Sequence, residues 1–325
     1  MSESNVVVVK VGKIEKHTNA DSLGVTKIFD YPVIVRLGEF VEGDKAVYVP
    51  VDSVVPVTDP RWAFLSGHAR IKAKRLRGIF SMGLLTAADP AWEAGQDVHE
   101  QLNIVKYEPP EPFQMGGDNE KDPGFLPVYT DVEGLRRFPD VLRPGEDVCV
   151  TEKIHGANGR AVWHEDRLWV GSHTGIKRED STNLWWKAAG KYNLAAALQA
   201  CPGVAIYFEV YGQVQDLKYG VNQSEVCRIA LFDALRIVDR TYLSVDAFQA
   251  LACSLGLPLV PLLYRGPWDA DQCAVLAEGK SLVSGSDNVR EGFVVRPAIE
   301  RFDERCGRVL LKRHGEGYLT RKEKP

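Results

Sequence analysis

Short runs of β-branched and aromatic residues, separated by glycine, proline and aspartate, dominate the chain and predict strands rather than long helices. Up to Val57 these runs alternate with glycine and aspartate turns, a pattern typical of a small β-barrel that continues to about Tyr107. Later runs that read as buried strands are residues 205–212, 229–235, 291–297 and 308–314. Helical spacing is confined to residues 131–138, 182–200, 244–255 with Ser244 as a cap, and 269–278. We therefore expect an α+β protein in which antiparallel sheets predominate.

A stretch rich in proline, glycine and acidic residues, 108–124, divides the chain and is too polar to build a core. We predict a first domain of residues 1–107, a linker over 108–124 and a second domain of 125–325. At 325 residues the chain is long enough for two sizeable cores, and its formal net charge of −4 does not exclude a nucleic-acid enzyme.

The cysteines and the chain start bear on the cellular compartment. The six cysteines form no CxxC pair and fall largely in apolar segments, so neither a zinc site nor a disulfide framework is indicated. The start lacks a basic region with an apolar leader, and no run approaches the roughly 18 apolar residues of a membrane span. We expect a cytoplasmic protein without membrane association, and no obligate protein partner is evident.

Positive charge is concentrated in one stretch of the first domain. Five cations occupy eight positions there: Arg70, Lys72, Lys74, Arg75 and Arg77. If the stretch is a strand, Arg70, Lys72 and Lys74 share one face. Such a row can follow a phosphate backbone, although lysines also guard edge strands against aggregation. We favour nucleic-acid binding, because small barrels commonly bind strands in a groove.

The candidate chemistry centres on Lys153, within Thr-Glu-Lys-Ile-His-Gly-Ala-Asn at residues 151–158. A lysine that attacks the α-phosphate of a nucleotide needs a neutral amine, a residue without a side chain where phosphate nears the backbone, and orienting donors. Gly156 and the donors His155 and Asn158 meet these needs. Taken alone, such a lysine is more often a solvated surface group, so the interpretation depends on the rest of the chain.

Polar residues interrupt the apolar runs downstream. Glu209 lies in the middle of one, where a buried carboxylate needs a cation, a metal-bound water or a ligand hydroxyl. The later runs carry Phe232 and Asp233, Glu291 and Arg296, and Lys312. Taken alone, each is better explained as core packing or as a salt bridge at a strand end. Together they place an amine, two acids and a base on consecutive strands.

In order and spacing these residues resemble the motifs of the covalent nucleotidyltransferases, the superfamily of polynucleotide ligases and RNA capping enzymes. Residues 153–158 are similar to the RNA ligase form of the first motif, and the later motifs are matched by residues 208–212, 231–233, 291–296 and 311–312. Residues 6–23 resemble the opening of tRNA-binding OB modules. Only 13 residues follow Lys312, which leaves no room for the OB domain that DNA ligases and capping enzymes place there. The order of parts resembles RNA ligases with an N-terminal OB module and a C-terminal adenylyltransferase domain.

The resemblance implies an ATP-dependent RNA ligase that joins 3′-hydroxyl and 5′-phosphate ends through a lysyl-AMP on Lys153 and an adenylylated 5′ end, in nick sealing or repair. Lys153, Glu209, Glu291 and Lys312 would be catalytic, with Lys312 neutralising the α-phosphate. Glu209 would serve the ribose hydroxyls or a metal-bound water and Glu291 the metal or the nucleophile, so both are candidate ligands of Mg²⁺ or Mn²⁺. Nucleotide contacts are implied for Glu152, Ile154, His155, Gly156, Asn158, Arg160, Phe232 as the ring that stacks on adenine, and Arg296. Burial, Lys312 and a divalent ion should favour the neutral amine of Lys153.

Three positions depart from the family's motifs. His173 stands where an arginine usually follows a serine, so Arg160, Lys177 or Arg178 are candidates for that phosphate contact. His314 replaces a common second lysine of the fifth motif, and Arg296 replaces a lysine at the end of the fourth. The roles of His173 and His314 stay open.

Two other functions fit parts of the pattern. A non-catalytic RNA-binding protein with an OB module is disfavoured by the intact set of amine, acids and base. A capping enzyme or DNA ligase is disfavoured by the missing C-terminal OB domain, although a separate chain could supply one. For an RNA ligase, a nicked duplex, a single strand and a tRNA break are all candidate substrates, and each strand could be RNA or DNA. The sequence also leaves open the choice between Mg²⁺ and Mn²⁺ and the oligomeric state of the protein.

Overall fold

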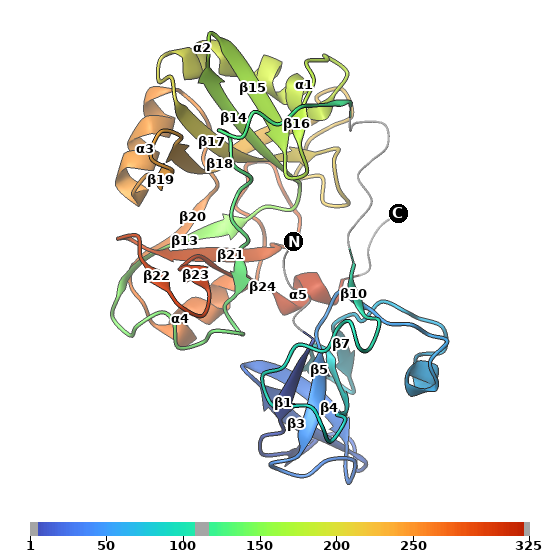
Figure 1. Ribbon diagram of the computed structural model, residues 1–325. Helices are drawn as coiled ribbons and strands as arrows, with labels where there is room; N and C mark the ends of the chain where they lie inside the picture. Colours follow the sequence, from blue (N-terminus) through green and yellow to red (C-terminus); the bar gives the residue numbers. More distant parts are fainter. Residues whose placement is uncertain (1–5, 108–116, 322–325) are drawn as a thin grey trace. The chain divides into compact units, whose positions relative to one another are not determined.

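The computed structural model describes residues 6–107 and 117–321 and divides the chain into two compact units (Figure 1). The first unit comprises Met1–Pro109 with Leu135–Pro139, and the second comprises Pro110–Gly134 with Asp140–Pro325. Residues 108–116 of the predicted linker lie outside the described residues. The remainder of that stretch includes the short strand β11 (Asn119–Glu120), which pairs with β16 (Ile176–Lys177) in a sheet of the second unit.

The first unit consists of short antiparallel strands around an apolar core, the small barrel that the sequence predicts. The strands are β1 (Val7–Lys10), β2 (Glu15–Lys16), β3 (Leu23–Ile28), β4 (Tyr31–Arg36), β5 (Lys45–Val49), β6 (Ser53–Val54), β7 (Lys74–Leu76), β8 (Ile79–Ser81), β9 (Leu84–Ala87) and β10 (Val105–Lys106). They form small sheets in the orders β1-β5-β9, β2-β3-β4, β7-β8 and β10-β6. Alternate residues of β5 face opposite sides, so that Val47 and Val49 join one apolar cluster and Tyr48 another. A 3₁₀ helix, η1 (Pro60–Leu65), places Trp62 fully inside the first cluster.

The second unit is built on two sheets. The seven-stranded sheet has the order β11-β16-β15-β14-β17-β18-β19, adding β15 (Arg167–Ser172), β14 (Ala157–His164), β17 (Val204–Gly212), β18 (Cys227–Arg236) and β19 (Thr241–Tyr242). The five-stranded sheet has the order β12-β24-β21-β13-β20, with β12 (Glu133–Gly134), β24 (Leu311–His314), β21 (Gly292–Pro297), β13 (Asp147–Lys153) and β20 (Leu262–Pro267). Only the β12–β24 pair among these described strands is parallel. A hairpin of β22 (Phe302–Asp303) and β23 (Gly307–Arg308) follows β21.

Helices flank these sheets at α1 (Leu184–Lys191), α2 (Leu194–Gln199), α3 (Val245–Ser254), α4 (Ala270–Ala274), η2 (Val275–Ala277) and α5 (Glu316–Leu319). The predicted helix at 244–255 is confirmed as α3, where Ser244 Oγ accepts a hydrogen bond from Ala247 N at 3.3 Å. The predicted helix at 182–200 is two helices, because Asn193 adopts a left-handed backbone with φ of 47°. The predicted helix at 131–138 is wrong. Glu133–Gly134 instead pairs with Leu311 and Lys312, so long-range strand pairing overrides the local spacing.

One face of the seven-stranded sheet is covered by α1, α2 and α3, whose apolar residues pack on alternate residues of β17 and β18. Phe208 and Val210 belong to this cluster, and the residue between them, Glu209, therefore points to the other face of the sheet. That other face carries the candidate site.

Candidate functional site

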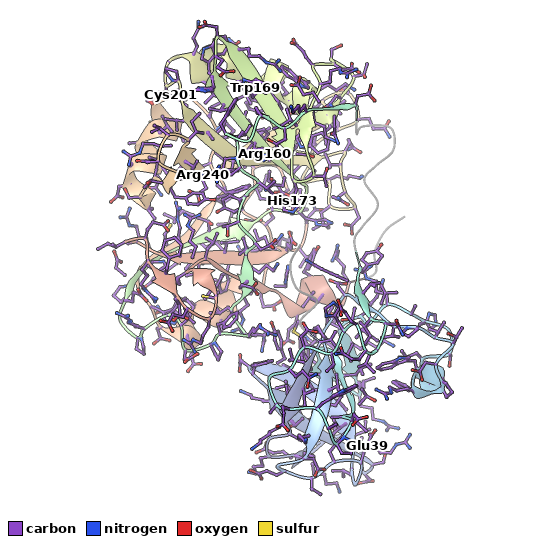
Figure 2. All side chains as sticks on the ribbon, viewed as in Figure 1. Glu39, Arg160, Trp169, His173, Cys201 and Arg240 are labelled. Carbon is purple, nitrogen blue, oxygen red and sulfur yellow. The ribbon has the colours of Figure 1, made fainter. Side chains whose placement is uncertain are left out.

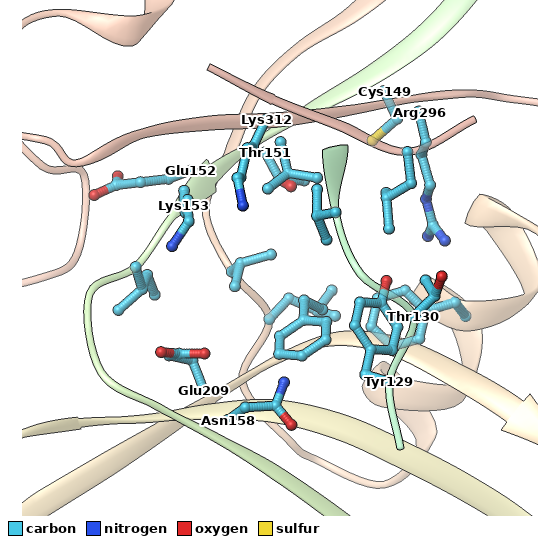
Figure 3. A pocket seen from close by; sticks show the side chains of 18 of the residues that line it. Tyr129, Thr130, Cys149, Thr151, Glu152, Lys153, Asn158, Glu209, Arg296 and Lys312 are labelled. Atoms are coloured by element: carbon cyan, nitrogen blue, oxygen red, sulfur yellow. The ribbon is translucent and has the colours of Figure 1, made fainter. Parts of the chain in front are cut away.

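A cavity of about 520 Å³ lies between the two sheets of the second unit (Figure 3), within the size range of small-molecule sites. Strand alternation turns Cys149, Thr151 and Lys153 of β13 toward it, and the lining also includes Glu152 between the last two. Its polar lining also includes Glu209, Asn158, His173, Arg296, Thr130, Gln249 and Lys312, and its apolar lining includes Ile154, Phe232, Val260 and Val294. The cavity thus offers charge at the Lys153 end and apolar, aromatic surface beyond it.

Lys153 is the last residue of β13, opposite Gly292 of β21. Its Nζ donates a hydrogen bond to Glu291 Oε1 at 2.9 Å, and its side chain remains 27% exposed. Burial acts to lower the pKa of Lys153, but the carboxylates of Glu291 and Glu209 outweigh burial and raise this pKa above its ordinary value. Without a divalent ion, these two carboxylates therefore favour the ammonium form of Lys153.

Glu291 is buried and ionised. Burial acts to raise its pKa, but Lys153, His314 and His155 lower it well below its usual range. His314 lies in the same row of strand partners as Lys153 and Gly292, and its Nε2 is 3.5 Å from Glu291 Oε1. His314 therefore supports the acid beside the lysine instead of lining the cavity.

Glu209 approaches the same amine from the opposite sheet. It lies across from Asn158 in the β14–β17 pair, and Figure 3 shows its carboxylate turned toward Lys153. Burial raises the pKa of Glu209 to about 8, against the attraction of the Lys153 ammonium. Asn158 Oδ1 beside it is buried and finds no hydrogen-bond partner among the described residues, which leaves it to a ligand.

The two glutamates fit a divalent cation. Glu291 Oε2 is buried and, within residues 6–107 and 117–321, has no hydrogen-bond partner. The same residues contain no group of three or more His, Cys, Asp or Glu that could hold a metal ion by themselves. Two carboxylates are nevertheless enough for a hard cation whose remaining positions are filled by phosphates and water.

Lys312 lies on β24, which pairs with the edge of β21 opposite β13, and its side chain lines the same cavity. It lies across from Val294, which in turn lies across from Thr151, so these three residues form a row that lines the cavity. This row lies two residues along each strand from the row of Lys153, and residues two apart in a strand face the same side. The structure therefore brings both lysines to one face of the same sheet, as Figure 3 shows.

His155 is held by a network that the sequence did not indicate. Asp216 is kept ionised, because Arg321 lowers its pKa despite burial, and its Oδ1 lies 2.9 Å from His155 Nε2. Burial also lowers the pKa of His155, so the neutral ring donates its Nε2 proton to Asp216 and accepts a hydrogen bond from Tyr318 at 3.2 Å. These partners come from segments far apart in sequence, and no local pattern could have found them.

Three predicted nucleotide contacts have another explanation in the fold. Glu152 alternates with Lys153, and its carboxylate points away from the amine and accepts a hydrogen bond from Leu282 N at 2.7 Å. A Cβ on Gly156 would meet Val210 O at 2.2 Å, so β17 explains the need for glycine there without a phosphate.

Arg160 is fully buried among the side chains of the seven-stranded sheet (Figure 2), where Nε donates to Ser172 O and Nη1 donates to Leu126 O. Its position does not support phosphate binding. Lys177 is also buried, over the ring of Trp185, whereas His173 lines the cavity and Arg178 is exposed. Of the candidates for the missing arginine contact, the geometry therefore favours His173 itself.

Phe232 and Arg296 line the far end of the cavity with Tyr129, which the sequence did not indicate. Tyr129 meets the Phe232 ring edge-on, with centroids 4.9 Å apart. Arg296 Nη1 donates to Asp233 Oδ1 at 3.0 Å, so its charge is matched within the protein.

The basic stretch of the first unit is only partly a strand, since β7 begins at Lys74. Its faces still alternate as predicted, with Ile71 and Ala73 buried and Lys72 and Lys74 exposed. Arg70 is bound to Asp52 at 2.8 Å and covers the ring of Tyr107. Arg75 and Arg77 are exposed in the β7–β8 hairpin, whose turn has positive φ at Arg77 and Gly78. Four of the five cations of this stretch, Lys72, Lys74, Arg75 and Arg77, are therefore exposed.

The raised pKa of Glu209 makes the stability of the ligand-free protein depend on pH. A carboxyl whose pKa is raised on folding stabilises the fold below its unfolded value, near 4.5, and this stabilisation is lost as pH rises through about 8. Glu209→Gln is therefore expected to be more stable than the natural protein above pH 8, by on the order of 1–3 kcal/mol, with the gap closing toward pH 5. Urea denaturation of both proteins at several pH values tests this, and a gap independent of pH would contradict it.

Comparisons with known proteins agree with this geometry. A family model described as RNA ligase matches residues 146–314, and one described as an OB-fold domain matches residues 5–88. The structure of Naegleria gruberi RNA ligase with PPi has a TM-score of 0.85 and 25% identity, covering 98% of each chain. A variant of that ligase with ATP and Mn has a TM-score of 0.84 and 26% identity, again over 98% of each chain. No match is found among curated protein sequences.

Two further observations concern the helices and the cysteines. In the described part of the chain, no helix is long and apolar enough to cross a membrane. All six cysteines are free thiols in the structure.

Proposed function

The chain belongs to the RNA ligase family, whose model spans more than half of it, and from this premise we propose an ATP-dependent ligase that joins 3′-hydroxyl and 5′-phosphate RNA ends through lysyl-AMP. The observation that carries the proposal is the surroundings of the Lys153 amine, which binds Glu291 at 2.9 Å and shares the cavity with Glu209 and Lys312. A surface lysine would need none of these partners. The Naegleria gruberi structures with ATP and Mn support the choice of nucleotide and of a divalent metal.

The ion pair between Lys153 and Glu291 keeps the nucleophile in place but protonated. Glu209 and Glu291 would hold the divalent ion, whose positive charge favours the neutral amine and offsets phosphate charge. Lys153 then attacks the α-phosphate and pyrophosphate leaves. Lys312 neutralises charge that develops on the phosphate oxygens, and Asn158 offers its amide to ribose or phosphate oxygens. In the later steps AMP passes to the RNA 5′-phosphate, and the 3′-hydroxyl displaces it.

The first test is incubation with α-labelled ATP and Mg²⁺ or Mn²⁺, followed by denaturing separation and peptide mapping. Label on the peptide containing Lys153, removed by added pyrophosphate, is the expected result. Folded protein that takes up no label with either metal, yet still binds RNA, would favour the non-catalytic alternative.

We further propose that the exposed cations of the first unit bind the RNA backbone. Lys72→Ala with Lys74→Ala should lower RNA affinity and reduce the slope of log K against log salt concentration by about 2, because each phosphate contact releases counterions. Binding to a nicked duplex between 50 and 300 mM salt, on the order of the range where such slopes are measured, tests this. Lys13→Ala with Lys27→Ala is the matched control, since both lysines are exposed on the same unit. Equal slopes in the two double variants would sink the assignment.

A further inference from the structure

Phe232 occupies an irregular position in β18. The pairing with β17 joins Phe208 to Leu231 and Tyr207 to Asp233, so the register skips Phe232. An extra residue of this kind is a β-bulge, which turns a side chain out of the regular alternation. Here the bulge presents the Phe232 ring to the cavity.

The residue after the bulge, Asp233, is fully buried and ties the two sheets together. Its Oδ1 accepts from Arg296 Nη1 of β21 at 3.0 Å, and its Oδ2 accepts from Arg308 Nη1 of β23 at 2.7 Å. Tyr129 donates its hydroxyl to Oδ2 at 2.8 Å. Glu300 binds Arg308 through two hydrogen bonds, at 2.9 and 2.6 Å, so the second arginine is also matched in charge.

This buried cluster sits beside a gap between the sheets. Phe232 is the neighbour of Asp233 on one sheet, and Val294 is two residues before Arg296 on the other, so it shares the face of Arg296. Phe232 and Val294 both line the cavity and both pack against the apolar cluster that contains Tyr129. The ion pairs therefore hold the two walls at a set separation, which the Tyr129 ring supports from the side.

We propose that Asp233 is a positioning residue which, through Arg296 and Arg308, sets the gap between Phe232 and Val294 that receives the planar purine of the nucleotide. This rests on the proposed function, because it takes the cavity as the nucleotide site. It also reassigns Arg296, which the sequence suggested as a nucleotide contact, to the support of that gap. Loss of the contacts between Asp233 and the two arginines should weaken binding of the purine base and leave binding of the phosphates unchanged.

Asp233→Asn keeps the shape of the side chain and removes its charge. It is expected to raise the KM for ATP in lysine adenylylation about tenfold, the scale of one lost charged hydrogen bond, while kcat at saturating ATP stays within about twofold. Two probes separate the ends of the site. The fluorescence of 2-aminopurine riboside triphosphate should be quenched less in the variant, because the base stacks less well on Phe232, whereas competition by inorganic tripolyphosphate should be unchanged. Asp303→Asn, at an exposed ion pair of the β22–β23 hairpin, is the matched control.

Tyr129→Phe keeps the ring and removes the hydroxyl that donates to Asp233 and accepts from Arg308 at 3.4 Å, so it gives a milder variant if Asp233→Asn does not fold. It should raise the KM about two- to threefold, because Asp233 keeps its charge and both arginine partners. In a Phe232→Leu background the effect of either change on the KM should shrink, because the aromatic ring whose position Asp233 sets is gone. An unchanged KM in whichever variant folds, or a parallel loss of tripolyphosphate binding, would overturn the proposal. The fluorescence and competition measurements need no catalysis, so they test the role of Asp233 even if the natural protein takes up no label.

Discussion

Replacing Lys153 by alanine is expected to abolish transfer of AMP from ATP to the protein, a loss of more than about 10⁴-fold, because no other amine lies where this one does. The side chain ends at the Glu291 carboxylate and faces Glu209 across the cavity, and alanine leaves those two acids without their cation. The measurement is label on the protein after incubation with α-labelled ATP and a divalent ion.

The same variant separates the steps of the reaction. RNA that already carries AMP at its 5′ end needs no lysine nucleophile, so Lys153→Ala should still seal it at a measurable rate. Lys187→Ala, on the exposed face of α1, is a control for handling and folding. Label on the Lys153→Ala protein would place the nucleophile elsewhere and contradict the proposed mechanism.

Strand periodicity accounts for what the sequence predicted well. Apolar runs with one polar interruption do become central strands, and the interrupting residue faces the cavity, as Glu209 shows between Phe208 and Val210. The same rule separates the side chains of two neighbouring residues in β13. Glu152 is next to Lys153 in a strand, so the two side chains had to face opposite ways.

Long-range partners account for what the sequence could not predict. The pKa of the Lys153 amine depends on Glu291 and Glu209, which lie far from it in sequence and whose attraction outweighs the effect of burial. The role of Arg296 depends in the same way on Asp233. The types and order of residues in the sequence indicate where the reacting groups lie. Their protonation states and ion-pair partners can be found only once the strands are assembled into sheets.

The contact between His314 and Glu291 explains why a histidine can stand where the fifth motif commonly has a second lysine. A second lysine at position 314 would place another cation against Glu291, where His314 approaches at 3.5 Å. Burial lowers the pKa of this histidine, so it supports the acid without competing strongly with Lys153 for its charge. Lys312 lines the cavity, and we expect this cation of β24 to meet phosphate.

Lys312→Met should accordingly slow lysine adenylylation by about 10²–10³-fold, the scale found when one charge-stabilising donor is removed from a transition state. Methionine keeps most of the side-chain volume in the row with Val294 and Thr151, so the sheet should be preserved. The loss should appear in kcat at saturating ATP, since Lys312 meets charge that grows during attack, and this distinguishes it from the KM effect expected of Asp233→Asn. Single-turnover labelling at saturating ATP measures the step directly, with Lys187→Met as the control for removing a lysine charge. A rate within about fivefold of the natural protein would mean that the α-phosphate is neutralised by another group, and His173, which also lines the cavity, would be the next residue to replace.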